Sequence, residues 1–249
     1  MKINEILHIE HGGQKKTIYF GSPDSAKELD EMYELRFSVY SRNGYFDTSK
    51  HHTQKDIDDY DHYGKCQYVI AVIDERIIGA VRLIQTTPLP TEVFFDFASP
   101  KIIEEIDPAN RAEISRLVID RYSKDSFLPR NLILLFLIKI LLKNGDDLGI
   151  VGGYAFIKKN LFEKLKRLKM PVKAIKLHMQ RYPSGGVLYN YFNQDENPVA
   201  PAYFISYEVE KYIEGILGED SRLVSRESSG DYVLNNTLYT KFLRRLKIL

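Results

Sequence analysis

The chain has little of what would place it in several common protein classes. It contains one cysteine, Cys66, and no tryptophan, so an internal disulfide framework is excluded and a reducing compartment is indicated. Its 35 basic and 34 acidic residues leave a net charge of +1, which gives no sign of nucleic acid or a membrane surface as partner. We therefore expect a cytoplasmic protein in which Cys66 packs as a small apolar side chain.

Long apolar segments are also missing. Residues 1–10 have no continuous apolar stretch behind a basic start, which argues against a secretory signal. The longest apolar segment, residues 132–142, is interrupted by Lys139 and is about half of the roughly 20 residues needed to cross a bilayer. We expect a buried helix there and no transmembrane segment.

The rest of the sequence has the periodicity of an α/β protein, and 44% of the 249 residues are hydrophobic, enough for a core. We expect a mixed sheet flanked by helices over residues 1–212, and a helical or partly ordered extension over 213–249. The expected helices are 22–43, 129–143 and 160–169. The expected strands are a hairpin within 1–21, a hairpin of 68–73 and 77–85, and single strands at 113–120, 149–157, 172–180 and 203–209.

Polar residues interrupt an otherwise apolar strand at Glu113, Ser115 and Arg116. Because successive side chains of a strand point to opposite faces, the pattern predicts Glu113 and Ser115 on one face and Arg116 on the other. A carboxylate in a cleft of low dielectric becomes more basic and can act as a general base. A buried ion pair between Glu113 and an arginine is the alternative, and the residues alone leave both open.

A second polar set combines two arginines with two carboxylates. Arg36 belongs to the first helix, Asp58 and Asp61 to the polar segment after it, and Arg82 to a hairpin strand. These groups could close into one ion-pair network, or leave carboxylates free to hold a cationic amine. The neighbouring Asp56 and Asp59 are expected to be solvated, as most acidic loop residues are.

Together these segments resemble one family of enzymes. Residues 34–40, 58–61, 79–83 and 113–116 occur in the order and spacing of the acyl-homoserine-lactone (autoinducer) synthases. The chain also resembles their relatives, the long-chain N-acyl amino acid synthases and the exosortase-associated acyltransferases. The resemblance covers residues 30–120 with good specificity and continues more loosely to residue 210.

The resemblance implies a fold like that of the GCN5-related N-acetyltransferases (GNAT) and an enzyme that moves an acyl group from a thioester to an amine. The thioester is implied to lie where two central strands splay apart. Glu113 is implied to be the general base, with Ser115 beside it in the catalytic centre. The residues implied to line or brace the acceptor side are Arg36, Tyr40, Tyr45, Asp58, Asp61, Arg82 and Arg116.

The implied donor depends on a segment that departs from the acetyltransferase pattern. GNAT enzymes carry a glycine-containing loop whose amides bind the coenzyme A pyrophosphate, whereas residues 121–131 contain no glycine. We therefore expect acyl carrier protein, rather than acyl-CoA, as donor and partner, and no bound cofactor. The basic residues that would meet its acidic surface, or else form a solvated helix face, are Lys158, Lys159, Lys164, Lys166, Arg167 and Lys169.

The acceptor side departs from the homoserine-lactone synthases as well. Those enzymes normally have a tryptophan shortly after the first helix, where this chain has Tyr45 and Phe46. Because an aromatic surface of that kind binds a sulfonium cation, its loss favours an amino acid over S-adenosylmethionine as the small-molecule amine acceptor. The alternatives are an acyl-homoserine-lactone synthase using S-adenosylmethionine, and a non-catalytic module that binds an acyl ligand or a carrier protein.

Two further sets of residues have open roles. The apolar helix 132–142 and several aromatic residues could line an acyl tunnel or form ordinary core. Those aromatic residues are Phe94, Phe95, Phe97, Tyr154 and Phe156. The histidines His51, His52, His62 and His178 have no metal-ligand spacing, and no metal is expected.

Overall fold

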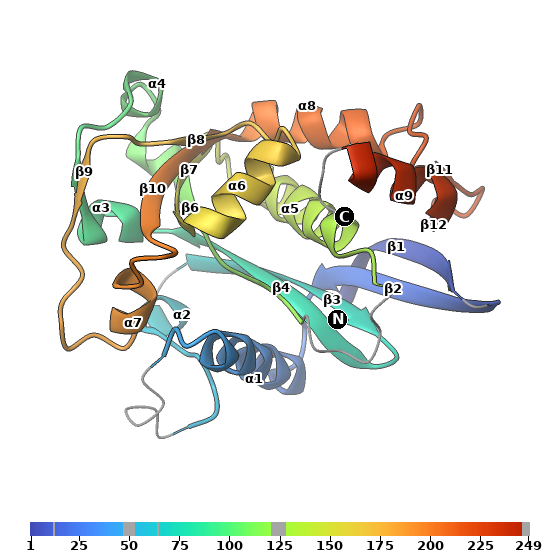
Figure 1. Cartoon of the computed structure of the whole chain (residues 1–249), viewed down its shortest axis with the longest axis horizontal. Helices are drawn as coiled ribbons and strands as arrows, with labels where there is room; N and C mark the ends of the chain where they lie inside the picture. Colours follow the sequence, from blue (N-terminus) through green and yellow to red (C-terminus); the bar gives the residue numbers. More distant parts are fainter. Residues whose placement is uncertain (12, 47–52, 64, 121–127, 246–249) are drawn as a thin grey trace.

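The computed structural model describes residues 1–11, 13–46, 53–63, 65–120 and 128–245. These residues form a mixed ten-stranded sheet with helices on both faces (Figure 1). Its strands are β1 (Lys2–His11), β2 (Gln14–Ser22), β3 (Lys65–Ile73), β4 (Arg76–Gln85), β6 (Arg111–Ile119), β7 (Gly152–Lys158), β8 (Val172–Ala174), β10 (Val199–Ile205), β11 (Val224–Arg226) and β12 (Tyr232–Leu234). They are ordered β11-β12-β1-β2-β3-β4-β6-β7-β10-β8. The expected α/β architecture is confirmed.

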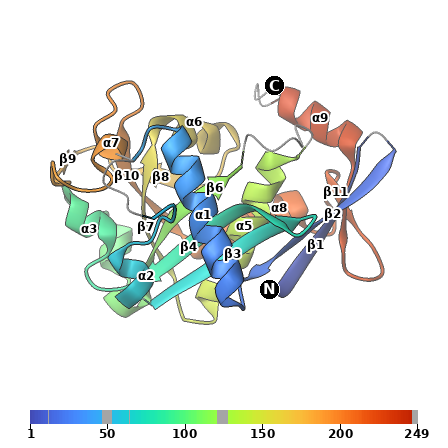
Figure 2. The ribbon, with the colours of Figure 1, turned by 90° about the horizontal axis from the view of Figure 1, so that it is seen from below.

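Helices cover the two faces of the sheet. α1 (Ala26–Arg42) and the short α2 (Asp59–Tyr63) lie on one face, and α5 (Arg130–Asp146) with α8 (Ser206–Leu217) lies on the other (Figure 1, Figure 2). The hydroxyl of Ser25 caps α1 by accepting from the Glu28 N–H, so this helix begins four residues after the expected start at residue 22. The other helical segments are α3 (Pro90–Phe94), α4 (Lys101–Glu104), a 3₁₀ turn (Pro108–Asn110), α6 (Lys159–Arg167), α7 (Tyr189–Phe192) and α9 (Asn236–Arg245).

The apolar segment 132–142 is a buried helix, as expected, and forms most of α5. Its one charged side chain, Lys139, donates to Glu5 at 2.6 Å and to the Tyr232 hydroxyl at 2.8 Å. The helix continues past its expected end at residue 143 and includes Gly145, where a Cβ would lie 3.2 Å from the Leu83 side chain. In the part of the chain that the structure describes, no helix is long and apolar enough to cross a membrane.

Two expected strands differ from those observed. The single strand expected over 172–180 is divided, because β8 pairs with β10 whereas β9 (His178–Gln180) pairs with β5 (Phe95–Phe97) in a separate two-stranded sheet. Pro201 of β10 has no N–H to donate, so the ladder with β8 ends beside it. The strand expected over 203–209 also ends early, since α8 begins at Ser206.

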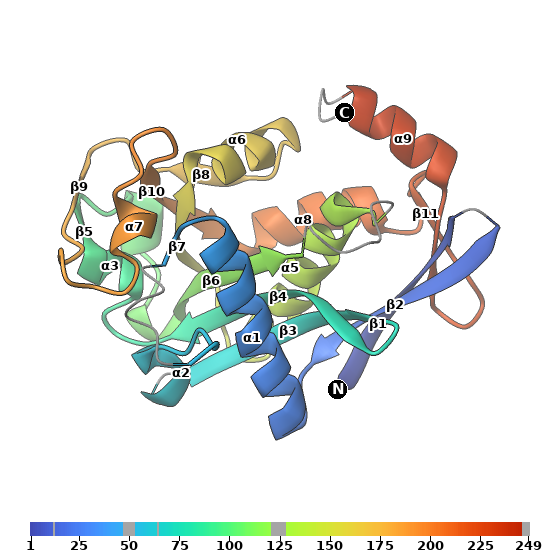
Figure 3. The same ribbon diagram turned by 60° about the horizontal axis from the view of Figure 1, so that its bottom comes forward.

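The C-terminal segment adds to the main sheet. β12 pairs in parallel with β1, with Tyr232 opposite Leu7, and Figure 3 shows β11 and the β1–β2 hairpin at the same end of the molecule. The domain boundary expected at 212/213 lies inside α8. The division of the chain into two domains stays a prediction.

The central strands β6 and β7 are paired only near their beginnings. The parallel ladder joins Arg111 to Gly152 and Glu113 to Tyr154; further along, β6 pairs with β4 and β7 pairs with β10. At the base of this splay the two backbones approach so closely that a Cβ on Gly153 would lie 1.8 Å from the Ala112 carbonyl oxygen. Glycine therefore permits the close pairing from which the two strands diverge.

Candidate functional site

A β-bulge in β6 determines where its polar side chains point. Arg82 of β4 pairs with Ser115, and Ala80 pairs with Val118, so β6 has one residue more than β4 between these pairs. Arg116 takes up the extra residue with a φ of 53°, and a bulge re-aims the side chains around it. The Arg116 guanidinium consequently shares one ion-pair partner, Asp58, with that of Arg82. The expectation that Arg116 lies on the face opposite Ser115 is wrong.

Glu113 is fully buried, and only one of its two oxygens is satisfied. Its Oε2 accepts a 2.6 Å hydrogen bond from the backbone N–H of Thr91, while Oε1 has no partner among the described residues. The buried ion pair with an arginine is therefore not formed within this part of the chain. Burial raises the pKa of Glu113 to about 8, because a carboxylate is poorly solvated there.

A cavity of about 290 Å³, the Glu113 pocket, opens beside this carboxyl group. Its polar lining residues are Asp56, Asp58, Asp59, Arg82, Glu113, Ser115 and Arg116. Its apolar and aromatic ones are Ile57, Tyr60, Ile84, Pro90, Phe94, Phe156, Tyr182, Val187 and Leu188. Both residues expected to be catalytic, and three of those expected on the acceptor side, thus share one cavity.

Asp56 is the centre of a buried ion-pair network. It is 2% exposed and accepts from Arg36 Nε at 2.9 Å and from Arg116 Nε at 2.7 Å. Arg36 also donates from both Nη atoms to Asp61, at 3.0 and 2.9 Å. The expectation that Asp56 is solvated is wrong. The sequence did contain a signal for a buried Asp56. Arg36, Arg82 and Arg116 carry three positive charges, whereas Asp58 and Asp61 supply only two negative ones, so a third buried carboxylate was needed to balance them.

Asp58 connects this network to the Glu113 pocket. It accepts from the two Nη atoms of Arg82 at 2.7 and 2.8 Å, and from Arg116 at 2.9 Å. Arg82 also donates from Nε to Ser115 at 3.0 Å and lies 2.7 Å from Asp61. The arginines hold the pKa of each of the three aspartates below its usual value. Of the two arrangements considered, the closed network is the one formed.

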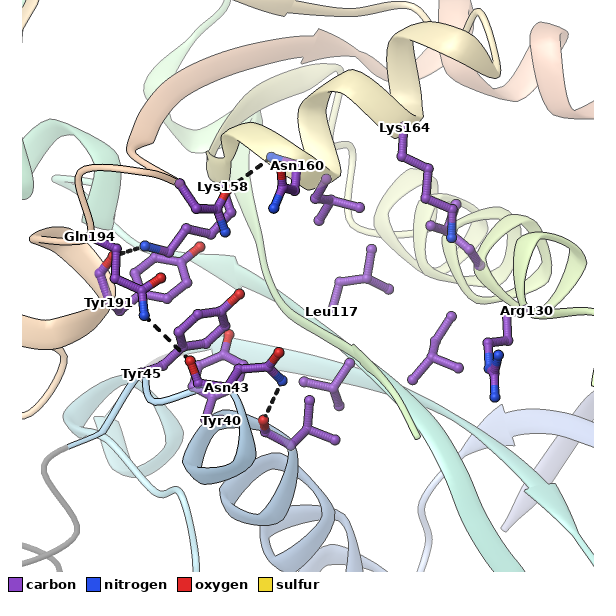
Figure 4. Close-up of a pocket in the computed structure, with 16 residues that line it drawn as sticks. Tyr40, Asn43, Tyr45, Leu117, Arg130, Lys158, Asn160, Lys164, Tyr191 and Gln194 are labelled. Atoms are coloured by element: carbon purple, nitrogen blue, oxygen red, sulfur yellow. Dashed lines mark hydrogen bonds between the residues drawn. The ribbon is translucent and has the colours of Figure 1, made fainter. Parts of the chain in front are cut away.

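A second cavity, the strand cleft, lies where β6 and β7 separate (Figure 4). It also measures about 290 Å³, and Tyr40, Tyr45, Leu117 and Lys158 are among its lining residues. The ring centroids of Tyr40 and Tyr45 are 5.5 Å apart in an edge-to-face contact. These two tyrosines, expected on the acceptor side, line the strand cleft and not the Glu113 pocket.

A smaller apolar pocket of about 90 Å³ lies between the other two cavities. It shares Ser115, Arg116 and Phe156 with the Glu113 pocket. It shares Tyr40, Leu117, Leu134, Leu161 and Tyr191 with the strand cleft. Its remaining lining residues are Ile114, Ile138, Ala155, Ile157, Leu165, Met170, Val172, Phe204 and Val209. The apolar pocket therefore shares walls with both of the other cavities, and Glu113 lines only the Glu113 pocket.

Part of the apolar set with an open role lies at these cavities. α5 contributes Leu134 and Ile138 to the apolar pocket, and Phe94 and Phe156 line the Glu113 pocket. The other three aromatic residues line none of the three cavities and pack in the core. These are Phe95, Phe97 and Tyr154.

Comparison with known proteins identifies the family. The sequence model of the family described as autoinducer synthase matches residues 22–183, well over half of the chain. The chain belongs to the autoinducer synthase family. No curated protein sequence matches it.

Solved structures of similar proteins have the same fold. The acyl-homoserine-lactone synthase LasI matches with a TM-score of 0.56 at 16% identity, over 80% of this chain and 94% of LasI. FeeM, an N-acyl amino acid synthase from uncultured soil microbes, matches with a TM-score of 0.55 at 14% identity, over 79% and 94%. BjaI, a coenzyme A-dependent acyl-homoserine-lactone synthase, matches with a TM-score of 0.52 at 17% identity, over 79% of this chain and 84% of BjaI.

Family membership makes the chain an acyltransferase that acts on an amine, as the resemblance implied. The structural matches support the GNAT-like fold expected from the sequence. A non-catalytic binding module is therefore set aside.

Within this family fold, the basic residues expected to meet a carrier protein separate into two groups. Lys159, Lys166 and Arg167 of α6 are exposed, and Lys164 reaches the strand cleft. Lys158 instead ends β7 and is 4% exposed. Because β7 continues one residue further than expected, Lys158 points into the cleft and cannot belong to an outer helix face.

Two segments of interest lie partly or wholly outside the described residues. They are 121–127, which holds most of the stretch without glycine, and 47–52, which contains His51 and His52. Elsewhere in the chain, no group of three or more histidine, cysteine, aspartate or glutamate side chains is placed to hold a metal ion.

Proposed function

We propose that the protein transfers a fatty acyl group from acyl carrier protein to the amine of an amino acid. The observation that carries this proposal is the buried carboxyl group of Glu113, whose Oε1 has no partner among the described residues and which lines a pocket that shares walls with an apolar one. An amine is protonated at neutral pH and must lose a proton before it attacks a thioester. A carboxylate of raised pKa inside the pocket suits that task.

The three cavities suggest a place for each part of the reaction. The acceptor would occupy the Glu113 pocket, the thiol arm of the donor the strand cleft, and the acyl chain the apolar pocket. Ser115 and Arg116 line both the Glu113 pocket and the apolar pocket. They would thus border the carbonyl carbon, while Tyr40 and Tyr45 would contact the donor.

Two features of the Glu113 pocket favour an amino acid as acceptor. Its volume of about 290 Å³ is at the low end of the range for small-molecule sites, which suits an amino acid better than a molecule carrying a nucleoside. The carboxylates of Asp56 and Asp58 are bound by arginines and are not left to hold a sulfonium cation. Its many apolar walls favour an amino acid with an apolar side chain.

The donor is proposed from charge and sequence. Exposed basic residues of α6 are complementary to an acidic carrier protein, and α6 borders the strand cleft through Asn160, Leu161 and Lys164. The absence of glycine from residues 121–131 removes the usual support for a coenzyme A pyrophosphate.

The test is an activity assay with purified full-length protein. Acyl carrier protein loaded with long-chain acyl groups is supplied with a panel of amino acids, and products are identified by mass spectrometry. We expect N-acyl amino acids. Turnover with acyl-CoA alone would contradict the proposed donor, and product formation only with S-adenosylmethionine would contradict the proposed acceptor.

The family match supports one second candidate, an acyl-homoserine-lactone synthase. This enzyme would consume S-adenosylmethionine and release an acylated lactone. The same assay separates the two functions, because the lactone and the N-acyl amino acid differ in mass.

A further inference from the structure

Lys158 holds a buried positive charge that the proposed reaction has not yet used. Its Nζ donates to the backbone oxygen of Tyr191 and lies 4.7 Å from the ring centroid of that residue and 5.2 Å from that of Tyr45 (Figure 4). No carboxylate of the described residues forms an ion pair with it. A buried ammonium without a counter-ion is costly, so its presence in a cleft suggests a ligand that develops negative charge there.

The position of Lys158 along β7 indicates which part of the donor it meets. Tyr154, Phe156 and Lys158 alternate along the strand and therefore share one face. Tyr154 lies opposite Glu113 at the base of the splay, Phe156 lines both the Glu113 pocket and the apolar pocket, and Lys158 lines the strand cleft. Because a strand rises about 3.3 Å per residue, the Cα of Lys158 lies about 7 Å along β7 from the Cα of Phe156. The lysine side chain is long enough to reach back over this distance toward the thioester sulfur.

We propose that Lys158 is the catalytic acid that protonates the departing thiolate of the donor. This inference rests on the proposed function. The acceptor ammonium first gives a proton to Glu113, which passes it to solvent. The neutral amine nitrogen then forms a C–N bond to the carbonyl carbon and gives a second proton to Glu113, while the C–S bond breaks and its electron pair stays on sulfur. The sulfur takes a proton from Nζ and leaves as a thiol. Solvent then reprotonates Lys158 and receives the proton held by Glu113.

The acidity of Lys158 is suited to this step. Burial lowers the pKa of its ammonium to about 8, close to the value of about 8.5 for an alkyl thiol such as cysteine. Proton transfer between groups of similar pKa is efficient. The other titratable groups that line the strand cleft are Tyr40, Tyr45, Tyr191, Arg130 and Lys164. Burial raises the pKa of the Tyr40 and Tyr191 hydroxyls above the ordinary value, so both are weaker acids than Lys158.

The test compares two donors that differ in their need for an acid. One is acyl carrier protein with its alkyl thioester, and the other is an acyl thioester of nitrothiobenzoate, an aromatic thiol that leaves without protonation. For Lys158→Met we expect kcat with the carrier thioester to fall about 100-fold or more, and kcat with the aromatic thioester to change little. The control is Lys101→Met, which removes an exposed ammonium on α4 that lines none of the three cavities and should leave both rates unchanged.

An equal loss with both donors, or no loss with either, would overturn the inference. Wild-type enzyme gives a second measurement if Lys158→Met does not fold. Its kcat with the carrier thioester should decline above pH 8 as Lys158 loses its proton, and its kcat with the aromatic thioester should not. A decline with both donors, or with neither, contradicts the role of Lys158. If wild-type enzyme makes no N-acyl product from either donor, the proposed function fails and the role of Lys158 fails with it.

Discussion

The backbone N–H of Thr91 donates a 2.6 Å hydrogen bond to Oε2 of Glu113 and leaves Oε1 unpaired among the described residues. This single contact fixes the orientation of the carboxyl group without neutralising it. A second donor to Oε1 would lower the pKa of Glu113 and weaken it as a base. The half-satisfied carboxyl group is therefore suited to accept a proton from a bound amine.

Replacing Glu113 by Gln tests that role. We expect Glu113→Gln to lower kcat by about 100- to 10,000-fold, the usual contribution of a positioned base, because the amide cannot accept the proton. Steady-state kinetics with the carrier thioester and an amino acid measure the effect, and circular dichroism checks the fold. The control is Glu92→Gln, which changes a nearby carboxylate that bonds the Leu89 N–H and does not line the Glu113 pocket. Unchanged turnover in Glu113→Gln would refute the assignment.

The raised pKa of Glu113 predicts opposite pH trends for rate and stability. The base must be ionised, so kcat should increase about tenfold per pH unit below pH 7 with either donor. With the aromatic thioester it should level off above pH 8, and with the carrier thioester it should pass through a maximum near pH 8, where Lys158 begins to lose its proton. The folded-state pKa of about 8 exceeds the ordinary value of 4.5, so between these pH values the folded protein retains a proton that the unfolded chain has released. The contribution of Glu113 to stability is therefore fully present below pH 4.5 and is lost as the pH rises to 8. Urea unfolding of wild type and Glu113→Gln across this range measures the difference, and parallel curves would contradict it.

The ion-pair network should matter more for stability than any surface pair. Asp56→Asn leaves the buried guanidinium groups of Arg36 and Arg116 with one anion too few, and breaking a buried pair typically costs about 3–5 kcal/mol. We expect a loss of this size in the free energy of urea unfolding. The control is Glu31→Gln, which removes the partner of Lys27 in an exposed pair at 3.6 Å and should cost less than about 0.5 kcal/mol. Equal, small losses in both variants would show that the network contributes little.

Most of the helices and strands, and most of the residues that form the site, could be predicted from the sequence, because hydrophobic periodicity and the four spaced motifs are local properties. The prediction for Arg116 was wrong because of the β6 bulge. Strict alternation placed Arg116 away from Ser115, although the apolar residues Ile114, Leu117 and Ile119 were already spaced by three and then two positions. That irregular spacing is the pattern a bulge produces, and it could have corrected the orientation of Arg116.

Other features could not be predicted from local pattern. Asp56 looks like any acidic loop residue until three arginines from α1, β4 and β6 converge on one place. In the sequence, Lys158 looked like the first residue of a basic helix face. Its side chain points into the strand cleft only because β7 continues one residue further than expected. Pairing partners such as β12 with β1 depend on contacts between residues more than 200 positions apart, which no periodicity encodes.

The splay between β6 and β7 should depend on the glycine at its base. Gly153→Ala places a Cβ 1.8 Å from the Ala112 oxygen, so one strand must shift, and we expect a loss of stability above about 3 kcal/mol and a loss of activity. Gly215→Ala is the control, because nothing lies within 4 Å of its Cβ and a helical glycine replaced by alanine gains about 0.5–1 kcal/mol. Thermal unfolding of both variants measures the contrast. A Gly153→Ala protein as stable as wild type would contradict the close approach of the two strands.

The apolar pocket should determine which acyl chains are accepted. Ala155 lines this pocket, whereas Ala202, directly opposite it on β10, is also buried but lines none of the three cavities. Ala155→Leu fills part of the space, so kcat/KM for long-chain donors should fall relative to short-chain donors, by about tenfold or more for each methylene group excluded. Ala202→Leu crowds the core by a similar volume and should cost stability without changing the preference for chain length. Competition between long- and short-chain acyl carrier protein measures the ratio directly. If both variants kept the wild-type ratio, the acyl chain would have to bind outside this pocket.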